Sequence, residues 1–476
     1  MKLSLLKLFS KRLRTRRTED GKLVKARYDA AGYGPENRKH WSASDDLSAD
    51  AAANYDVRKT LRQRARYEVE NNSYAKGIIL TLANDTIGTG PRLQCLTDDE
   101  TLNSDVEVAF GKWAEAIDLA GKLRIVRRVR AVDGEAFIFL VQNPKVRNND
   151  VKLDLQLIEA DQVTNSQNVM LEDEETQVDG IKLDRFGNPV SYHVLLHHPG
   201  GNYATNNVID KAKDYPAENV IHYFRIDRPG QHRGIPEITS ALPLFAQLRR
   251  FTLAVITAAE SAADFAGIIY TDSPAGGESE DLAALDPIQL ERNMLLTMPG
   301  GWKMGQLDSK QPCSTYGEFK NQILNEISRC LNMPFNIASG NSSGYNYASG
   351  RLDHQTYYKS IRVEQKNIVT RILDPIFRRW YREYAMATGK SVTAIPDHTW
   401  FWDGFEHVDP SKEANATAIR LQNNVTTYAI EYAKQGRDWE DELRQRAKEK
   451  RLMKELGLTD ADLRRHDASN NEENEE

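Results

Sequence analysis

The N-terminal part of the chain carries apolar residues at helical spacing. Residues 57–82 repeat them every three or four positions, which predicts one amphipathic helix that ends before Gly88. Its apolar positions include Leu61, Ala65, Val69, Tyr74, Ile78, Ile79 and Leu82. Shorter helical patterns follow at 110–119 and 123–132.

Strand patterns follow these helices. The candidate strands are residues 135–142, 151–158, 180–183, 190–196 and 220–225. Gly187-Asn188-Pro189 separates the third from the fourth and suits a turn, because Gly and Asn tolerate positive φ and proline fixes its own φ. The chain therefore combines helical and strand-forming regions.

A long helix is predicted at residues 242–265, because no breaker follows its first turn. At about 1.5 Å per residue it would be roughly 36 Å long. A compact insert at 267–314 comes next, with strand-like ends at 268–271 and 295–304, and a second helix is predicted at 316–331.

Residues 339–350, with the sequence SGNSSGYNYASG, are polar and rich in Gly and Ser. This composition predicts a loop. A long helix is expected from about 351 to 386, and Pro375 lies within it. Because proline removes a backbone donor, the helix should kink there.

The C-terminal part begins with an aromatic pattern at 398–405, which predicts a strand. Residues 410–456 predict two helices separated near Gly436, with Asp438 as the N-cap of the second.

Composition fits a large globular protein with two or more substructures, since 40% of the 476 residues are hydrophobic and 28% are charged. No transmembrane helix is expected, because no run of eighteen apolar residues occurs. The formal charge of −6 argues against a surface that grips nucleic acid everywhere. The basic stretch 11–17 and the acidic stretch 470–476 predict solvated tails.

Candidate chemistry is sparse. Three widely spaced cysteines, Cys95, Cys313 and Cys330, predict neither a disulfide framework nor a metal site, and we expect them to be reduced and intracellular. His197 and His198 are adjacent, without a carboxylate cluster beside them in sequence, so surface histidines are expected. The sequence contains no P-loop, HExxH or GxSxG motif, and we expect no cofactor, no metal and no catalytic residue.

Several segments along the chain resemble the portal subunits of tailed bacteriophages, in the lambda-like family. The most specific is FRIDRPGQHRGIP at 224–236. The others are RARYEVENNSYAKGI at 64–78, IGTGP at 87–91, DGEAF at 133–137 and VDPSKE at 408–413. Residues 273–286 and those beyond 458 match nothing in the family pattern.

The resemblance implies an α+β portal fold with wing, stem, clip, spine and crown regions. It also implies a non-enzymatic subunit of a ring of about twelve copies at one capsid vertex, assembled in the host cytoplasm and carried in the virion. The ring would be the channel for packaging and ejecting double-stranded DNA. Its implied partners are the terminase large subunit, the major capsid and scaffold proteins and the head-tail connector, with no membrane.

The implied regions follow one another along the chain. They are a basic arm and linker (1–56), the wing (57–241), a first stem helix (242–266), the clip (267–314), a second stem helix (315–333), the channel loop (334–350), the spine helix (351–388), a strand returning to the wing (389–409), and a helical crown with an acidic tail (410–476).

The resemblance makes three sets of residues candidates for contact with DNA. In the loop they are Ser339, Asn341, Ser342, Ser343, Tyr345, Asn346 and Tyr347, which carry no charge and would touch phosphates weakly. The stem adds Arg249 and Arg250, and the clip adds Lys303 and Lys310. A plain connector remains the alternative for the loop, and ion pairs or a solvated face remain the alternatives for the basic residues.

A DNA-processing enzyme is the competing hypothesis. Asp133, Glu135, Glu159 and Asp161 lie on or beside strand-like segments and are expected to be able to converge. Such carboxylates would bind Mg²⁺ for DNA cleavage.

Overall fold

The computed structural model describes residues 39–146, 149–165, 176–201, 212–264, 268–271, 302–305, 316–389, 394–404 and 410–458. The chain divides into two units, Met1–Ala52 and Ala53–Glu476. The described part of the first unit contains helix α2 (Ala49–Ala52). The expected basic stretch at 11–17, Cys313, and the acidic tail beyond 458 lie outside the described residues.

Two helices replace the single helix that the pattern at 57–82 predicts. They are α3 (Tyr55–Asn71) and α4 (Ser73–Ile87), and Asn72 separates them. Asn72 has an extended backbone, its N–H donates to Glu68 O at 2.8 Å, and its side chain accepts from Tyr74 N at 3.0 Å. One asparagine thus caps both helix ends, a local preference that the apolar periodicity conceals.

The next helices are longer than their apolar patterns. Helix α5 (Glu100–Ala116) begins at Asp99, whose carboxylate accepts from the amides of Thr101 and Leu102. Helix α6 (Leu119–Asp133) ends at Gly134, which has φ +92°. The periodicity missed the polar first turns, which the caps define.

Two antiparallel sheets follow. The first has the strand order β3 (Leu153–Ile158), β2 (Glu135–Gln142), β8 (Val220–Phe224). The second is a meander of β4 (Thr176–Val178), β5 (Ile181–Leu183), β6 (Pro189–Leu195) and β7 (Ala212–Pro216). Short 3-10 turns lie at Ala160–Gln162 and Ala217–Asn219. The predicted strand regions are confirmed, apart from shifts at their ends, and β4 and β7 were not predicted.

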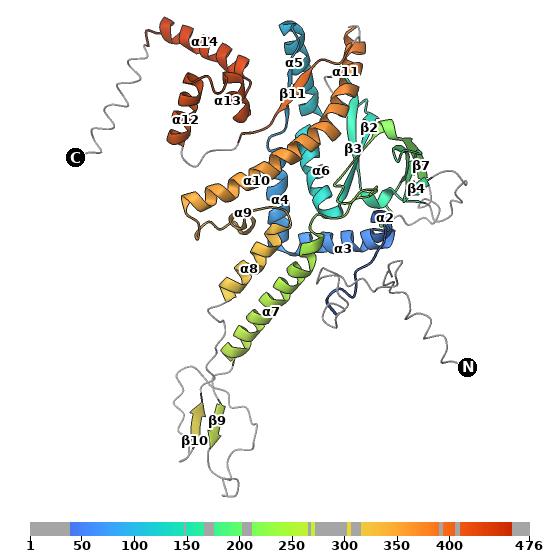
Figure 1. Ribbon diagram of the computed structural model, residues 1–476, viewed down its shortest axis with the longest axis vertical. Coiled ribbons are helices and arrows are strands. Elements are labelled where there is room, and N and C mark those ends of the chain that lie inside the picture. The colour runs from blue at the N-terminus through green and yellow to red at the C-terminus, as the bar shows by residue number, and fades with distance from the viewer. Residues whose placement is uncertain are drawn as a thin grey trace, which may run out of the picture. The chain divides into compact units, whose positions relative to one another are not determined.

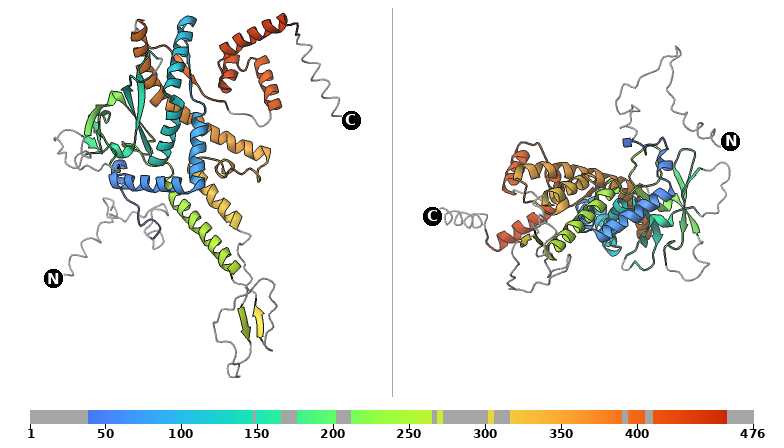
Figure 2. Two further views of the ribbon diagram at one scale, coloured as in Figure 1. Left: turned by 180° about the vertical axis from the view of Figure 1, so that it is seen from behind. Right: turned by 90° about the horizontal axis from the view of Figure 1, so that it is seen from below.

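Strand β2 is buried on both faces. Phe137 and Phe139 pack in one apolar cluster with the second sheet, including Tyr192, whereas Ala136 and Ile138 belong to the cluster formed with helices α5, α6 and α11. Figure 2 shows the strands lying beside the helices. Alternation along this strand therefore joins two cores rather than separating core from solvent.

The long helix predicted at 242–265 is confirmed as α7 (Leu242–Asp264), which follows a 3-10 turn at Thr239–Ala241. Helix α8 (Tyr316–Arg329) contacts α7, and Phe251 stacks on Tyr316 with ring centroids 5.7 Å apart. Strands β9 (Ile268–Thr271) and β10 (Trp302–Gly305) form an antiparallel pair (Figure 1). The predicted strand-like stretch at 295–304 lies only partly within the described residues.

Helices α10 (Tyr347–Ile368) and α11 (Asp374–Thr388) are joined by a π-helical turn, Val369–Leu373. Pro375 lies in the first turn of α11 and cannot donate to the carbonyl of Arg371. The wider turn accommodates this missing bond, and Figure 1 shows the helix axis changing direction there. The predicted kink is confirmed.

The two helices belong to different cores. Tyr357 and Ile361 of α10 pack in a cluster with α4, α7 and α8. Helix α11 contributes Phe377 and Trp380 to an aromatic cluster around Phe110, whose ring centroid lies 5.1 Å from that of Trp380.

Strand β11 (His398–Phe401) pairs with β1 (Arg92–Cys95), with Trp400 opposite Leu93. It is shorter than the predicted 398–405, and residues 405–409 lie outside the described part.

Three helices follow β11, not the predicted two: α12 (Pro410–Gln422), α13 (Tyr428–Lys434) and α14 (Trp439–Glu455). Asn424, with φ +54°, and the cap at Thr427 create the additional break. The side chain of Asp438 accepts from Glu440 N at 2.8 Å, so the predicted N-cap is confirmed.

Candidate functional site

Four carboxylates proposed as a nuclease site do converge, but arginines hold them. Arg66 on α3 forms two hydrogen bonds with Asp133, at 2.7 and 2.8 Å. Arg62, one turn earlier on α3, bonds Asp161 at 3.0 Å. Spacing of i,i+4 places both arginines on the helix face that meets these acids.

Glu135 is fully buried and is the most enclosed of these carboxylates. Arg233 donates to it at 2.6, 2.9 and 3.0 Å, and the Gly234 amide adds a bond of 2.9 Å. Burial opposes ionisation of Glu135, but the charge of Arg233 and the bond from His222 outweigh it, so its pKa lies well below the usual range. Both carboxylate oxygens are engaged by protein donors.

The two most distinctive sequence segments meet at this ion pair. Gly134 has φ +92°, and a Cβ there would overlap the backbone of Ile235. A Cβ on Gly234 would overlap the backbone of Gly134. The segments at 133–137 and 224–236 thus cross at two glycines, and the pair formed by Glu135 and Arg233 closes the crossing.

His198 does have acidic neighbours, contrary to the prediction. Its Nε2 lies 3.2 Å from Glu159 and 3.9 Å from Asp161. One ligand atom from each residue lies within 4.8 Å of the others. However, Nη2 of Arg66 lies 3.1 Å from Glu159 and 2.8 Å from Asp161, so a guanidinium occupies the position between the acids. The arrangement fits an ion-pair network, and it gives no support to Mg²⁺-dependent cleavage.

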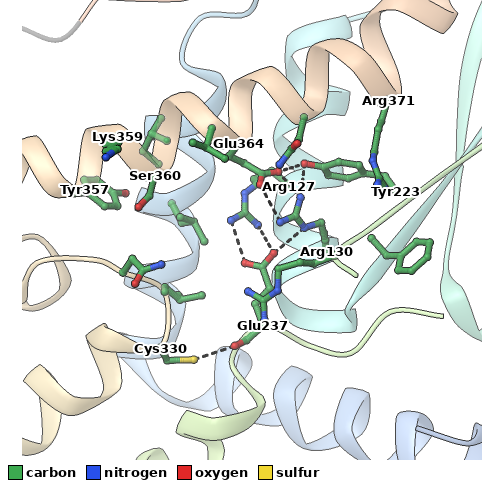
Figure 3. Close-up of a pocket in the computed structure, with 18 of the residues that line it drawn as sticks. Arg127, Arg130, Tyr223, Glu237, Cys330, Tyr357, Lys359, Ser360, Glu364 and Arg371 are labelled. Atoms are coloured by element: carbon green, nitrogen blue, oxygen red, sulfur yellow. Dashed lines mark hydrogen bonds and ion pairs between the residues drawn. The ribbon is translucent and has the colours of Figure 1, made fainter. Parts of the chain in front are cut away.

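A second network forms the floor of a surface groove of about 520 Å³ (Figure 3). Glu237 accepts from Arg127 at 3.0 Å and from Arg130 at 2.7 Å. Arg130 also pairs with Glu364 on α10, which accepts from the hydroxyl of Tyr223. These bonds connect α6, α10 and the first sheet through buried charges.

The charges in this floor stabilise one another. Burial raises the cost of ionising Glu237, yet Arg127 and Arg130 outweigh that cost and lower its pKa to about 2. Burial likewise disfavours the charged form of Arg130, but Glu237 and Glu364 raise its pKa. Each group is therefore ionised at neutral pH only because its partners are in place.

The predicted loop at 339–350 is shorter than its composition indicates. Ser339 ends helix α9 (Phe335–Ser339), and Gly340, with φ +65°, caps that helix. Asn346 and Ser349 form a capping box, so α10 begins at Tyr347 rather than at 351. The prediction was wrong at both ends, because serine and asparagine were counted as loop formers although they cap helices here.

Residues 340–346 remain as the connection, with an exposed, uncharged surface. Gly340 to Gly344 are exposed, and the amide of Ser343 donates to the Asn341 side chain at 2.9 Å. Among the candidates, Asn341, Ser342, Ser343, Tyr345 and Asn346 lie in this connection.

The basic candidates differ in their surroundings. Arg249 on α7 pairs with Glu68 of α3 at 3.0 Å and lies over the ring of Tyr67, so it has partners within its own chain. Arg250 and Lys303 are exposed. Lys310 lies outside the described residues.

Sequence reasoning missed the buried arginines Arg58, Arg62, Arg127, Arg130 and Arg233. A signal was present: Arg62 and Arg66, and likewise Arg127 and Arg130, recur at helical spacing on helices that are otherwise partly apolar. Partners distant in sequence were needed to identify them as structural.

This combination of helices, crossed motifs and exposed uncharged connection is that of a phage portal protein. The model of the family described as phage portal protein, lambda family, matches residues 35–365. The chain belongs to this family, and its predicted portal function is confirmed.

Curated relatives agree in name and length. The probable portal protein of Halomonas phage phiHAP-1 is 25% identical over 436 residues, covering 85% of this chain and 82% of the relative. The portal protein of Escherichia phage N15 is 21% identical, with 90% of each chain covered. Among solved structures, a chain of the virion of a native gene transfer agent particle is 14% identical, with a TM-score of 0.46 over 79% of this chain and 92% of that one.

Hydropathy was also checked across the helices that the structure describes, and none of them combines the length and the apolar character needed to cross a bilayer.

Proposed function

We propose that the chain forms a closed ring of about twelve copies at one capsid vertex and that duplex DNA passes through it during packaging and ejection. The match to the lambda family of portal proteins carries this proposal. In this account the protein is structural, and the carboxylates of the wing stabilise its fold rather than bind a catalytic metal.

The regions keep the boundaries that the sequence resemblance implies. The wing is 57–241, the stem is formed by 242–266 and 315–333, the clip is 267–314, and the crown and tail are 410–476. Terminase large subunit and head-tail connector would dock on this ring, which major capsid and scaffold proteins would surround in the virion. The proposal assembles the ring in the host cytoplasm.

Segment 340–346 is our proposed DNA-facing element. It is exposed and carries no charge. Each Lys or Arg paired with a phosphate strengthens a salt-dependent grip on DNA, which opposes sliding. An uncharged loop on a subunit of net charge −6 therefore suits a channel that surrounds DNA without holding it.

Solution mass and negative-stain electron microscopy test the ring. The proposal expects closed rings with a hole wide enough for a duplex, and no Mg²⁺-dependent cutting of linear DNA. Compact monomers under assembly-promoting conditions, together with DNA cleavage, would favour the enzyme instead.

A gain of charge tests the loop. Asn341→Lys with Ser343→Lys should make assembled rings retain a linear duplex, with retention that decreases steeply as salt rises. The control is Met386→Lys with Leu352→Lys, two exposed positions outside the connection. Equal retention by both variants would refute a DNA-facing loop.

A further inference from the structure

The groove above Glu237 has an exposed basic rim. On α10, four lining residues recur every four positions, so they form one row along the helix: Lys359, Val363, Asn367 and Arg371. All four are exposed. Ile226 and Asn332 line the groove as well, and both are exposed (Figure 3).

The rim has positive charge that the floor does not balance. Glu237 and Glu364, the two carboxylates that line the groove, are already bonded to Arg127 and Arg130. Arg225 also lines it and pairs with Asp227 at 2.7 Å. Among the described residues, no acidic side chain lies within ion-pair distance of Lys359 or of Arg371.

Apolar side chains lie between these cations. Val363 is 59% exposed and Ile226 is 50% exposed. A duplex presents phosphates and sugars along its outside and gains little from such apolar contacts. A protein segment gains from both, because interfaces join an apolar centre to charged edges.

We propose that this groove receives an acidic segment of a second copy of the chain, with a carboxylate next to an apolar side chain. The inference rests on the proposed ring. In a closed ring each copy presents one surface to one neighbour and a different surface to the other, so a groove on one subunit meets another part of the next. A subunit of net charge −6 has acidic surface to offer, and the groove supplies the complementary charge.

Charge reversal at the rim tests the contact. The variant Lys359→Glu with Arg371→Glu should raise the protein concentration for half-maximal ring assembly by about tenfold or more, measured by sedimentation velocity. The matched control is Lys366→Glu with Arg378→Glu, two exposed cations on α10 and α11 that do not line the groove. Because both variants change net charge equally, general repulsion affects both.

The outcomes are distinct. Unaltered chain that forms rings, with equal assembly by both variants, would overturn the groove contact and leave the ring intact. Failure of the unaltered chain to form rings would overturn the proposed function and this inference together. Normal assembly of the groove variant with loss of duplex binding would assign the groove to DNA and overturn the proposal. Far-UV circular dichroism and a thermal melt of each variant monomer show whether it folds.

Cross-linking identifies the occupant independently. A photo-crosslinking residue in place of Val363, in rings mixed from light and isotopically heavy subunits, should form light-to-heavy cross-links to a peptide that contains Asp or Glu. The same residue in place of Met386 should not reach that peptide. Cross-links confined to one subunit would overturn the proposal.

Discussion

Glu237 provides the sharpest test of the buried networks. Its side chain is 3% exposed and accepts bonds from two arginines. In Glu237→Gln the shape is retained, but the charge that balances Arg127 and Arg130 is lost. The pKa of Glu237 falls from 4.5 to about 2, and this shift corresponds to about 3 kcal/mol of unfolding free energy at neutral pH.

The pH dependence has a definite sign. Because the pKa in the folded state lies below that in the unfolded state, the stabilisation is complete above about pH 5 and is lost as the pH falls toward 2. The gap between the unaltered protein and Glu237→Gln should therefore shrink from about 3 kcal/mol at pH 7 to about 1 kcal/mol at pH 3.

Urea unfolding at both pH values measures this gap, at protein concentrations where only monomers occur. Glu440→Gln is the control, since it removes an exposed i,i+4 partner of Arg444 and should cost less than about 0.5 kcal/mol. A gap below about 1 kcal/mol at pH 7, or one that widens on acidification, would refute the reasoning.

Three further substitutions probe the fold. Arg233→Met leaves Glu135 buried without its main partner and should lower the unfolding free energy by about 3–5 kcal/mol; an unchanged urea midpoint would count against it. Gly134→Ala should prevent soluble expression or lower the unfolding free energy by more than about 3 kcal/mol, because φ is positive and the Cβ overlaps Ile235; normal solubility and melting would contradict this. Asn346→Ala should cost about 1 kcal/mol and speed amide exchange in the first turn of α10, whereas unaltered exchange would exclude the cap.

Sequence patterns predicted the long elements well. The apolar stripe at 242–265 gave α7 nearly residue for residue, since no internal polar cap competes with it. Pro375 placed the break between α10 and α11, because a missing donor acts locally. Asn72 and Asn346 were misjudged for the converse reason: a capping side chain decides a helix boundary without changing the apolar pattern.

The candidate site was less accessible to sequence reasoning. The carboxylates at 133, 135 and 161 were selected as groups able to converge, and they do so. Their role reversed when their partners were identified, because Arg66 and Arg233 are distant in sequence and only the fold brings them close. Periodicity also cannot show that Arg249 pairs with Glu68, a contact between two helices.

A cryo-electron microscopy reconstruction of the purified assembly tests the central claim most directly. The account predicts a closed ring in which residues 340–346 of every copy line a lumen that admits a duplex. A ring with these residues on its outer surface, or particles without a lumen, would contradict it.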